Sequence, residues 1–325
     1  MAITISGSGI TSANIADGTI TTDDILASDV KNLKSGRKNL IINGGFDVWQ
    51  RGTSGFGHNV YSADRWREDF NTGNGVAISK HNISSGGETG LPLGFTSAFK
   101  YALTVGSGSG SGLNDVRQKI ELPKRFEGQT FTLSYYVKAS SSCTVSNRRI
   151  YLVNVTNPFS GASLPSLSVT TTWQKVTDTF TFGTSSTAVY SSSSFLDLVL
   201  SAPVATSVDI DYYITGVQLE LGSVATDFEH RSYGEELALC QRYYYAITES
   251  QWVYMLASSG ANTYGRATVN YPVTMRAAPT VAYTVSNSSY SSSNTQSVGI
   301  NASTIYTNGT SNIIQIQTAT FSAEL

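Results

Sequence analysis

Branched aliphatic residues recur at every fifth position over the first thirty residues. They are Ile10, Ile15, Ile20, Ile25 and Val30. A helix turning ~100° per residue would scatter them around its circumference, and a continuous strand would put successive ones on opposite faces. The spacing predicts a repeated unit of short strand and turn, with Asp17-Gly18 as one turn pair. One apolar residue in five cannot build a core within one chain. The pattern therefore favours several copies wound together as an oligomeric stalk.

Short runs of alternating apolar and polar residues follow, from about residue 39 to residue 220. Phe131, Leu133, Tyr135 and Val137 make one apolar row. Further rows run over 196–200, 210–214 and 217–221, and serine- or glycine-rich breaks such as 106–112 and 191–194 separate the runs. Alternation with period two indicates strands that are covered on one face. Short strands at this spacing predict an all-β, jelly-roll-like β-sandwich.

One helix interrupts the strand pattern. Ser232 and Glu235 have the spacing of a capping box, and Leu237, Cys240 and Tyr244 follow at helical intervals, which predicts a helix over about 233–243. The strand pattern then returns at 252–256, 267–273, 280–285 and 313–321, while 286–297 is predicted to be a polar loop. The patterns therefore divide the chain into the N-terminal repeat (1–36), the sandwich (37–235), and the helix with a smaller C-terminal β domain (236–325).

Composition narrows the possible functions. Charged residues make up 14% of the 325 residues and the net charge is −2, so solubility rests on neutral polar groups. The sequence contains no stripe of basic residues of the kind that binds nucleic acid. No apolar run approaches the ~20 residues of a membrane-spanning helix. The two cysteines, Cys143 and Cys240, are too few for a disulfide framework and are expected to be isolated buried thiols. We expect no nucleic acid, no membrane insertion and no cofactor.

Several blocks of the sequence resemble a known family. They are Asn39-Leu-Ile-Ile-Asn-Gly-Gly-Phe-Asp-Val-Trp-Gln-Arg-Gly52, Tyr61-Ser-Ala-Asp-Arg-Trp66, and residues 116–121, 128–139, 217–229 and 239–244. In this order they resemble a module of bacteriophage tail fibre and related virion fibre proteins. Residues 16–21 (Ala-Asp-Gly-Thr-Ile-Thr) also resemble a repeat at the N-termini of phage fibres. The resemblance implies a sandwich like that of carbohydrate-binding modules within a homotrimeric fibre.

Aromatic residues suggest two places for sugar contacts. Trp49, Tyr61 and Trp66 could form a platform on which a sugar ring stacks. Large aromatic side chains are mostly buried in hydrophobic cores, so we favour a structural role for these three residues. Better candidates lie in the C-terminal domain, where aromatic residues stand among Ser, Asn and Gly. The predicted glycan contacts are Trp252, Tyr254, Tyr264, Tyr290 and Tyr306. A solvated loop with interface aromatics is an equally weighted alternative.

Catalytic patterns are weak. His58, His81 and His230 are far apart in sequence and show no metal-ligand or nucleophile spacing. Asp209 and Asp211 could share one face of a strand, as glycan hydrolysis or calcium binding would need. Simple solvation of this pair is the favoured interpretation. We predict no catalytic residue and no metal site.

These observations predict a homotrimeric structural protein on the exterior of a virion. Its N-terminal repeat would dock to other virion proteins, and its distal β domain would bind a host-surface glycan. One alternative is a capsid-bound fibre or decoration protein for virion stability or loose attachment. Another is a polysaccharide depolymerase, which would require Glu121, Asp209 and Asp211 to converge in a groove.

Overall fold

The computed structural model describes residues 38–325 apart from 70–74, 106–113, 122, 204–207, 248–252, 257–262, 287–289 and 310–312. The five aliphatic residues of the predicted stalk, Ile10, Ile15, Ile20, Ile25 and Val30, lie outside the described residues. The wound stalk, the trimer and the docking role of 1–36 therefore stay predictions.

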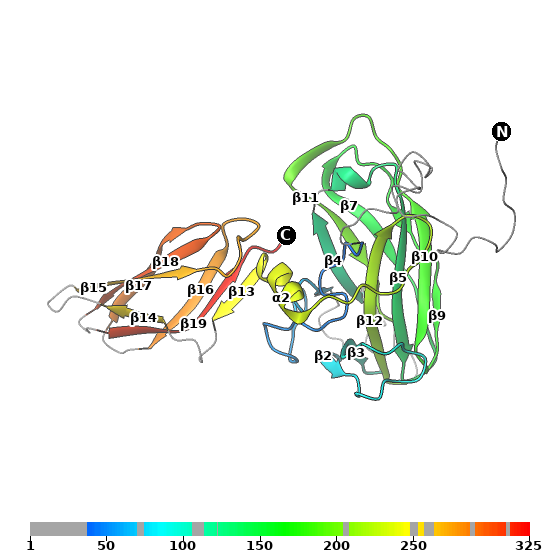
Figure 1. Ribbon diagram of the computed structural model, residues 1–325, viewed down its shortest axis with the longest axis horizontal. Coiled ribbons are helices and arrows are strands. Elements are labelled where there is room, and N and C mark those ends of the chain that lie inside the picture. Colours follow the sequence, from blue (N-terminus) through cyan, green and yellow to red (C-terminus); the bar gives the residue numbers. More distant parts are fainter. Residues whose placement is uncertain are drawn as a thin grey trace, which may run out of the picture. The chain divides into compact units, whose positions relative to one another are not determined.

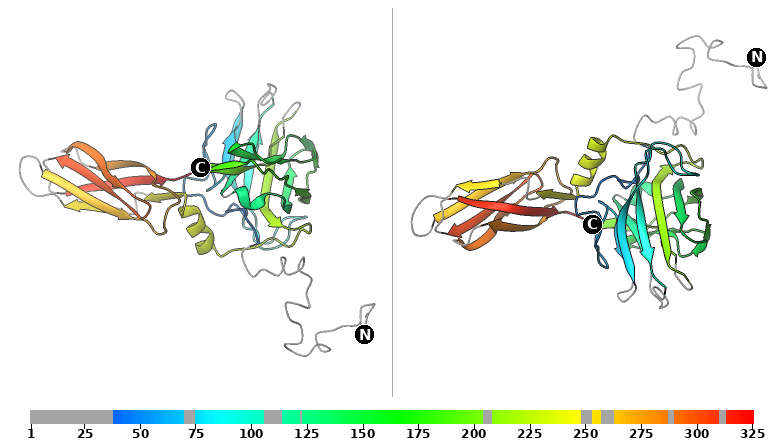
Figure 2. Two further views of the ribbon diagram at one scale, coloured as in Figure 1. Left: turned by 90° about the horizontal axis from the view of Figure 1, so that it is seen from above. Right: turned by 90° about the horizontal axis from the view of Figure 1, so that it is seen from below.

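Two five-stranded antiparallel sheets form the larger β unit; Figure 1 labels most of their strands, and Figure 2 shows the same ribbon from two further sides. The first sheet has the order β1 (Arg67–Asp69), β4 (Asp115–Glu121), β11 (Val189–Val199), β7 (Arg149–Thr156) and β8 (Ala162–Ser163). The second has the order β10 (Gln174–Thr181), β5 (Thr130–Ala139), β12 (Ile210–Leu221), β3 (Ser97–Leu103) and β2 (Val76–Asn82). A 3₁₀ helix, η3 (Pro123–Phe126), and a pair formed by β6 (Cys143–Val145) and β9 (Leu167–Val169) complete this unit.

The main core lies between these sheets. Phe131, Leu133, Tyr135 and Val137 of β5 are buried in it, as their alternation predicts. Successive long strands β4, β5, β7, β10, β11 and β12 belong alternately to the first and second sheet. This connectivity and the shared core confirm the predicted jelly-roll-like sandwich.

Strand β12 joins two apolar rows that the sequence presents separately. Ile210, Tyr212 and Ile214 are buried at even positions, whereas Val217 and Leu219 are buried at odd positions. A bulge between Thr215 and Gln218 inserts the extra residue that shifts the phase, so both rows face the same core. Leu221, the last member of the second row, is 41% exposed and does not join the core.

Two segments predicted to be breaks are strands. Ser191–Ser194 lies inside β11, where the pairing with β7 is irregular between Tyr190 and Phe195. Ser194 Oγ bridges this irregularity, because it accepts from Ser191 N at 2.8 Å and donates to Asn154 O at 2.5 Å. The predicted polar loop 286–297 mostly forms β17 (Tyr290–Val298), which pairs with β18 (Ala302–Gly309). Pairing along a partner strand outweighs the loop-forming tendency of serine and asparagine here.

The predicted helix is confirmed. Helix α2 (Tyr233–Gln241) begins at the N-cap Ser232, and both capping-box hydrogen bonds with Glu235 are present. Within the described residues, no helix has the length and apolar character that crossing a bilayer requires. Both cysteines are free thiols; Cys240 is buried, as expected, whereas Cys143 is only half-buried.

The C-terminal strands form two further sheets around a separate small core. Strand β19 (Ile313–Ser322) pairs with β13 (Tyr244–Ile247), β14 (Val253–Leu256) and β16 (Thr280–Ser286). Strand β18 lies between β15 (Thr263–Asn270) and β17. The core includes Val269, Met275, Ile305, Ile316 and Phe321. These strands are yellow to red in Figure 1.

Candidate functional site

The outer face of the second sheet is partly covered by the chain itself. Outward-facing Thr132 and Ser134 of β5 are almost fully buried. Segment 222–230 crosses this end of the sheet, because Lys175 Nζ donates to Thr226 O (3.3 Å) and Thr179 Oγ1 donates to Ser223 O (3.4 Å). The serine and threonine side chains on this part of the face are therefore buried by the chain itself.

A second, small apolar cluster covers a neighbouring part of the same face. Its buried members are Ile83, Leu91, Phe95, Ala98 and Trp173, and the half-buried side chains of Tyr136, Tyr213 and Phe228 pack against it. Residues 83–96 connect β2 to β3, so this connection lies over the sheet and supplies three of the apolar side chains. Tyr213 therefore stands at the border between a packed cluster and an open, polar part of the face.

The open part is organised across three strands. Tyr213 of β12 is in register with Lys138 of β5 on one side and with Lys100 of β3 on the other. The two ammonium groups lie 4.9 and 5.7 Å from the centre of the Tyr213 ring. The His81 ring meets the same ring edge-on, with centroids 4.8 Å apart. Cross-strand pairing thus surrounds one aromatic ring with cations.

Two carboxylates neutralise these cations. Asp211 accepts from Lys100 Nζ at 2.7 Å and from the Tyr213 hydroxyl at 3.3 Å. Glu88 accepts from Lys138, from His81 Nε2 (2.9 Å) and from Trp173 Nε1 (2.8 Å). Burial raises the pKa of Glu88, but the three hydrogen bonds outweigh this effect and lower that pKa to about 2. Glu88 is therefore ionised throughout the physiological pH range.

We call this set of side chains the Tyr213 face. It comprises His81, Glu88, Lys100, Lys138, Asp211 and Tyr213. The side chains of its charged members and of His81 are 19–35% exposed. The two ammonium groups of Lys100 and Lys138 balance the two carboxylates of Asp211 and Glu88. Hydroxyl groups of a ligand can use the remaining donors and lone pairs without displacing an ion pair.

Among the described residues, no group of three or more His, Cys, Asp or Glu side chains is placed to hold a metal ion. The acidic residues considered for glycan hydrolysis also do not converge. Asp211 lies on the second sheet beside Lys100, and Asp209 accepts from Val105 N at 2.7 Å. Glu121 lies on the first sheet, where it contacts Arg242 and Arg276. The expectation of simple solvation is wrong for Asp211, because the carboxylate is held in an ion pair.

The predicted tip contacts fall on both C-terminal sheets. Trp252 lies outside the described residues. Tyr254 belongs to β14 and pairs with Gln315, whereas Tyr264 of β15 pairs with Asn308 and Tyr290 of β17 pairs with Gly309. Tyr306 of β18 is half-buried and stands between Arg266 and Asn294 in register. The last three tyrosines belong to one sheet, and their contact with a glycan stays a prediction.

Trp49, Tyr61 and Trp66 do not form an open platform. Trp66 is completely buried, and Trp49 packs against the main core with its ring 6.0 Å from that of Phe56. The Tyr61 hydroxyl donates to Leu325 O at 3.3 Å. The structural interpretation of these three residues is therefore correct.

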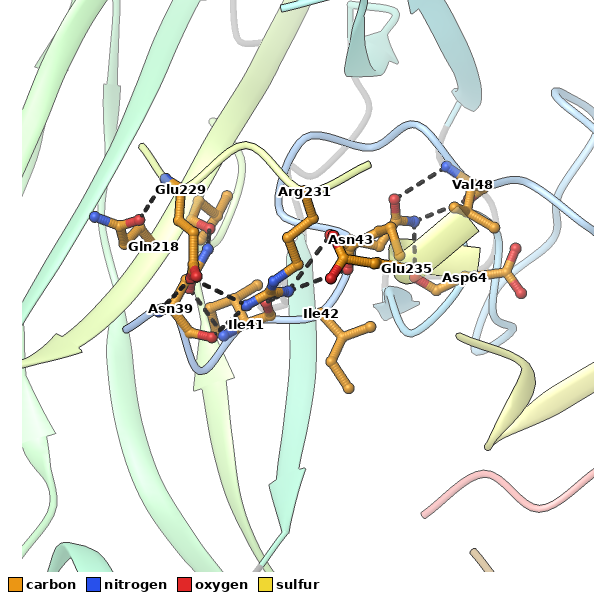
Figure 3. A network of polar contacts seen from close by, with 12 residues as sticks. Asn39, Ile41, Ile42, Asn43, Val48, Asp64, Gln218, Glu229, Arg231 and Glu235 are labelled. Carbon is orange, nitrogen blue, oxygen red and sulfur yellow. Dashed lines mark hydrogen bonds and ion pairs between the residues drawn. The ribbon is translucent and has the colours of Figure 1, made fainter. Parts of the chain in front are cut away.

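The sequence blocks that carry the family resemblance meet in one buried polar network, shown in Figure 3. Asn39 Nδ2 donates to Val217 O at 3.1 Å. Asn43 Nδ2 donates to Asp64 O at 3.0 Å, and Trp66 Nε1 donates to Asn43 O at 2.9 Å. Arg231 joins the network by donating to Asn39 O at 2.5 Å. Blocks 39–52, 61–66 and 217–229 therefore hold the fold together.

No protein-family model matches the chain, and no curated protein matches it. Several solved structures are similar to it. A putative sugar-binding protein from Bacteroides thetaiotaomicron is 14% identical, with a TM-score of 0.38, over 57% of this chain and 100% of that one. The family 11 carbohydrate-binding module of a cellulosomal cellulase from Clostridium thermocellum is 11% identical, with a TM-score of 0.31, over 56% of this chain and 100% of that one.

Enzymes are also among the similar structures. A cyclase from Fischerella sp. TAU, in complex with 4-(1H-indol-3-yl)butan-2-one, is 14% identical, with a TM-score of 0.38, over 59% of this chain and 100% of that one. At this level of identity the likeness concerns the fold alone.

Proposed function

We propose that this chain is a structural attachment protein of a virion fibre and that its sandwich binds a surface glycan at the Tyr213 face. The observation that carries the glycan proposal is the half-buried Tyr213 ring, which is set among charge-balanced polar groups on an open part of the sheet. An aromatic ring offers an apolar plane to the C–H face of a sugar, and the surrounding donors and acceptors suit its hydroxyls.

The virion part of the proposal rests on the sequence. The blocks 39–52, 61–66 and 217–229 resemble a module of phage fibres, and the five-residue repeat favours several copies per fibre. Several copies would make a weak sugar site effective, because linked sites raise the overall affinity without new contacts. Docking of residues 1–36 to a tail or to a capsid is a separate part of the proposal, and identification of the bound virion protein tests it.

Glycan binding is tested with the full-length protein on an array of bacterial surface polysaccharides and oligosaccharides. Tyr213→Ala should weaken binding to every recognised glycan at least about tenfold, since the sugar loses its apolar contact. Tyr233→Ala is the matched control, because Tyr233 is 60% exposed at the start of α2 and lies outside the face. Equal binding by Tyr213→Ala and wild type would overturn the assignment of the site.

A further variant distinguishes glycan binding at the predicted tip site from glycan binding at the Tyr213 face. Tyr306→Ala changes β18 in the C-terminal domain and leaves the sandwich unaltered. Loss of binding in Tyr306→Ala with retention in Tyr213→Ala would move the glycan site to the tip. The absence of binding by the wild-type protein to any saccharide on the array would count against glycan attachment itself.

A further inference from the structure

Residues 323–325, which follow β19, contact side chains of the sandwich. Glu324 accepts from Arg51 Nη2 at 3.0 Å and from Arg65 Nη1. The Glu324 side chain is 7% exposed, and that of Arg65 is 1% exposed. An ion pair buried to this extent is sensitive to the loss of either partner, because the remaining charge stays desolvated.

Each of the two arginines stacks on an aromatic ring. The guanidinium carbon of Arg51 lies 3.5 Å from the centre of the Tyr244 ring, and that of Arg65 lies 3.5 Å from the centre of the Tyr243 ring. Both tyrosines come from the segment that leaves α2 and enters β13. Stacking fixes the planes of the two guanidinium groups, so that their N–H groups converge on one carboxylate.

Backbone contacts complete the arrangement. Leu325 O accepts from Lys119 Nζ and from the Tyr61 hydroxyl. Ala323 N donates to Tyr243 O at 2.8 Å, and Arg276 Nε donates to Ala323 O at 2.8 Å. Each of the three residues is therefore held. Arg51 and Arg65 both pair with Glu324, Arg51 also lies 3.4 Å from Asp64 Oδ1, and Lys119 binds the backbone of the next residue, Leu325.

We propose that Arg51, Arg65, Lys119 and Tyr61 form a binding site for an acidic peptide segment, and that residues 323–325 of the same chain occupy it as a latch. The latch fastens the end of β19 to the sandwich, while α2 and β13 fasten the start of the C-terminal domain. The two β units then unfold together, and a load on the C-terminal domain reaches the sandwich through two attachments.

Scanning calorimetry and limited proteolysis of the full-length protein test the latch. Glu324→Gln keeps the size of the side chain and removes its charge, and it should split the unfolding into two transitions. The C-terminal domain should unfold first, at a temperature lower by about 5–10 °C. Proteolysis between the two units should become faster. Asp209→Asn is the matched control, because an asparagine oxygen can still accept from Val105 N.

A second variant and a mass measurement complete the test. A chain that ends at Ala323 should behave as Glu324→Gln does, and a peptide containing Ala-Glu-Leu should restore part of the lost stability when added in excess. Unfolding of Glu324→Gln that is indistinguishable from Asp209→Asn would overturn the latch. A multimer that falls apart only in Glu324→Gln would also overturn it, because the occupant would then belong to another copy.

Discussion

Lys138 stands between the ring of Tyr213 and the carboxylate of Glu88. Its ammonium lies 4.9 Å from the ring centre and is hydrogen bonded to Glu88. Glu88 in turn accepts from Trp173 Nε1, which belongs to the apolar cluster beneath the connection between β2 and β3. One carboxylate therefore ties the connection, the sheet and the candidate sugar-binding ring together.

Glu88→Gln should lower the free energy of unfolding by about 1 kcal/mol at pH 7. The pKa of Glu88 is about 2 in the folded protein and lies near 4.5 in the unfolded chain, so the carboxylate stabilises the fold above pH 4.5. This contribution declines as pH falls toward 2. Urea unfolding of both proteins at pH 7 and pH 3 measures the difference, which should be smaller at pH 3. A difference that is the same at both pH values would contradict the assignment.

Glu68 should make stability depend on pH in the opposite direction. It is fully buried and accepts from Ser62 Oγ, and burial raises its pKa to about 8 despite that hydrogen bond. Between pH 4.5 and pH 8 the unfolded chain releases this proton and the folded protein retains it. Stability due to Glu68 therefore falls as pH rises through this window, by up to a few kcal/mol.

The variant Glu68→Gln isolates this effect. Glutamine keeps an oxygen for Ser62 and cannot ionise, so the variant should match wild type near pH 4 and exceed it near pH 8. Subtraction of the two urea-unfolding curves at each pH removes the contribution of other groups, such as Asp64, whose pKa is raised by burial to about 6. Parallel profiles from pH 4 to pH 9 would show that Glu68 titrates normally.

Gly216 lies at the bulge of β12 and cannot be replaced without strain. Its φ is +64°, and a Cβ atom there would meet ring atoms of Phe95 at 2.8 Å and of Tyr136 at 3.1 Å. Gly216→Ala should destabilise the fold by about 2–3 kcal/mol. Gly57→Ala is the control, because its Cβ would meet nothing within 4 Å. Thermal unfolding of the two variants gives the comparison, and equal melting temperatures would refute a packing role.

Much of the sandwich is predictable from sequence, because burial on one face of a strand imposes a visible period of two. Residues 131–137 and the capping box at Ser232 are examples. The bulge at Gly216 is not predictable in this way, since one inserted residue makes a single long strand read as two rows. Strand β17 cannot be recognised in the sequence for another reason: its serines and asparagines adopt a strand conformation because they pair with β18.

The candidate site depends on contacts that no local pattern contains. Tyr213 and Lys138 each lie on the polar side of a recognisable strand, so their exposure could be predicted. Their pairing joins residues 75 positions apart, and Glu88 reaches them from an irregular connection. The same holds for Arg51 and Glu324, which come from opposite ends of the described chain. Long-range register and loop conformation are properties of the folded chain, and a single sequence does not display them.

The five-residue repeat makes a separate prediction about assembly. Because Ile10, Ile15, Ile20, Ile25 and Val30 cannot be buried by one chain, the full-length protein should be a multimer in solution, and removal of residues 1–36 should loosen or dissociate it. The resemblance to phage fibres makes a trimer the expected multimer. Mass photometry or light scattering of both proteins measures this directly. The shortened chain should remain folded, because the cores of the sandwich and of the C-terminal domain involve residues from Ile41 onward. A monomeric full-length protein would instead favour an N-terminal arm that becomes ordered only on the virion, and a decoration role would then be the better model.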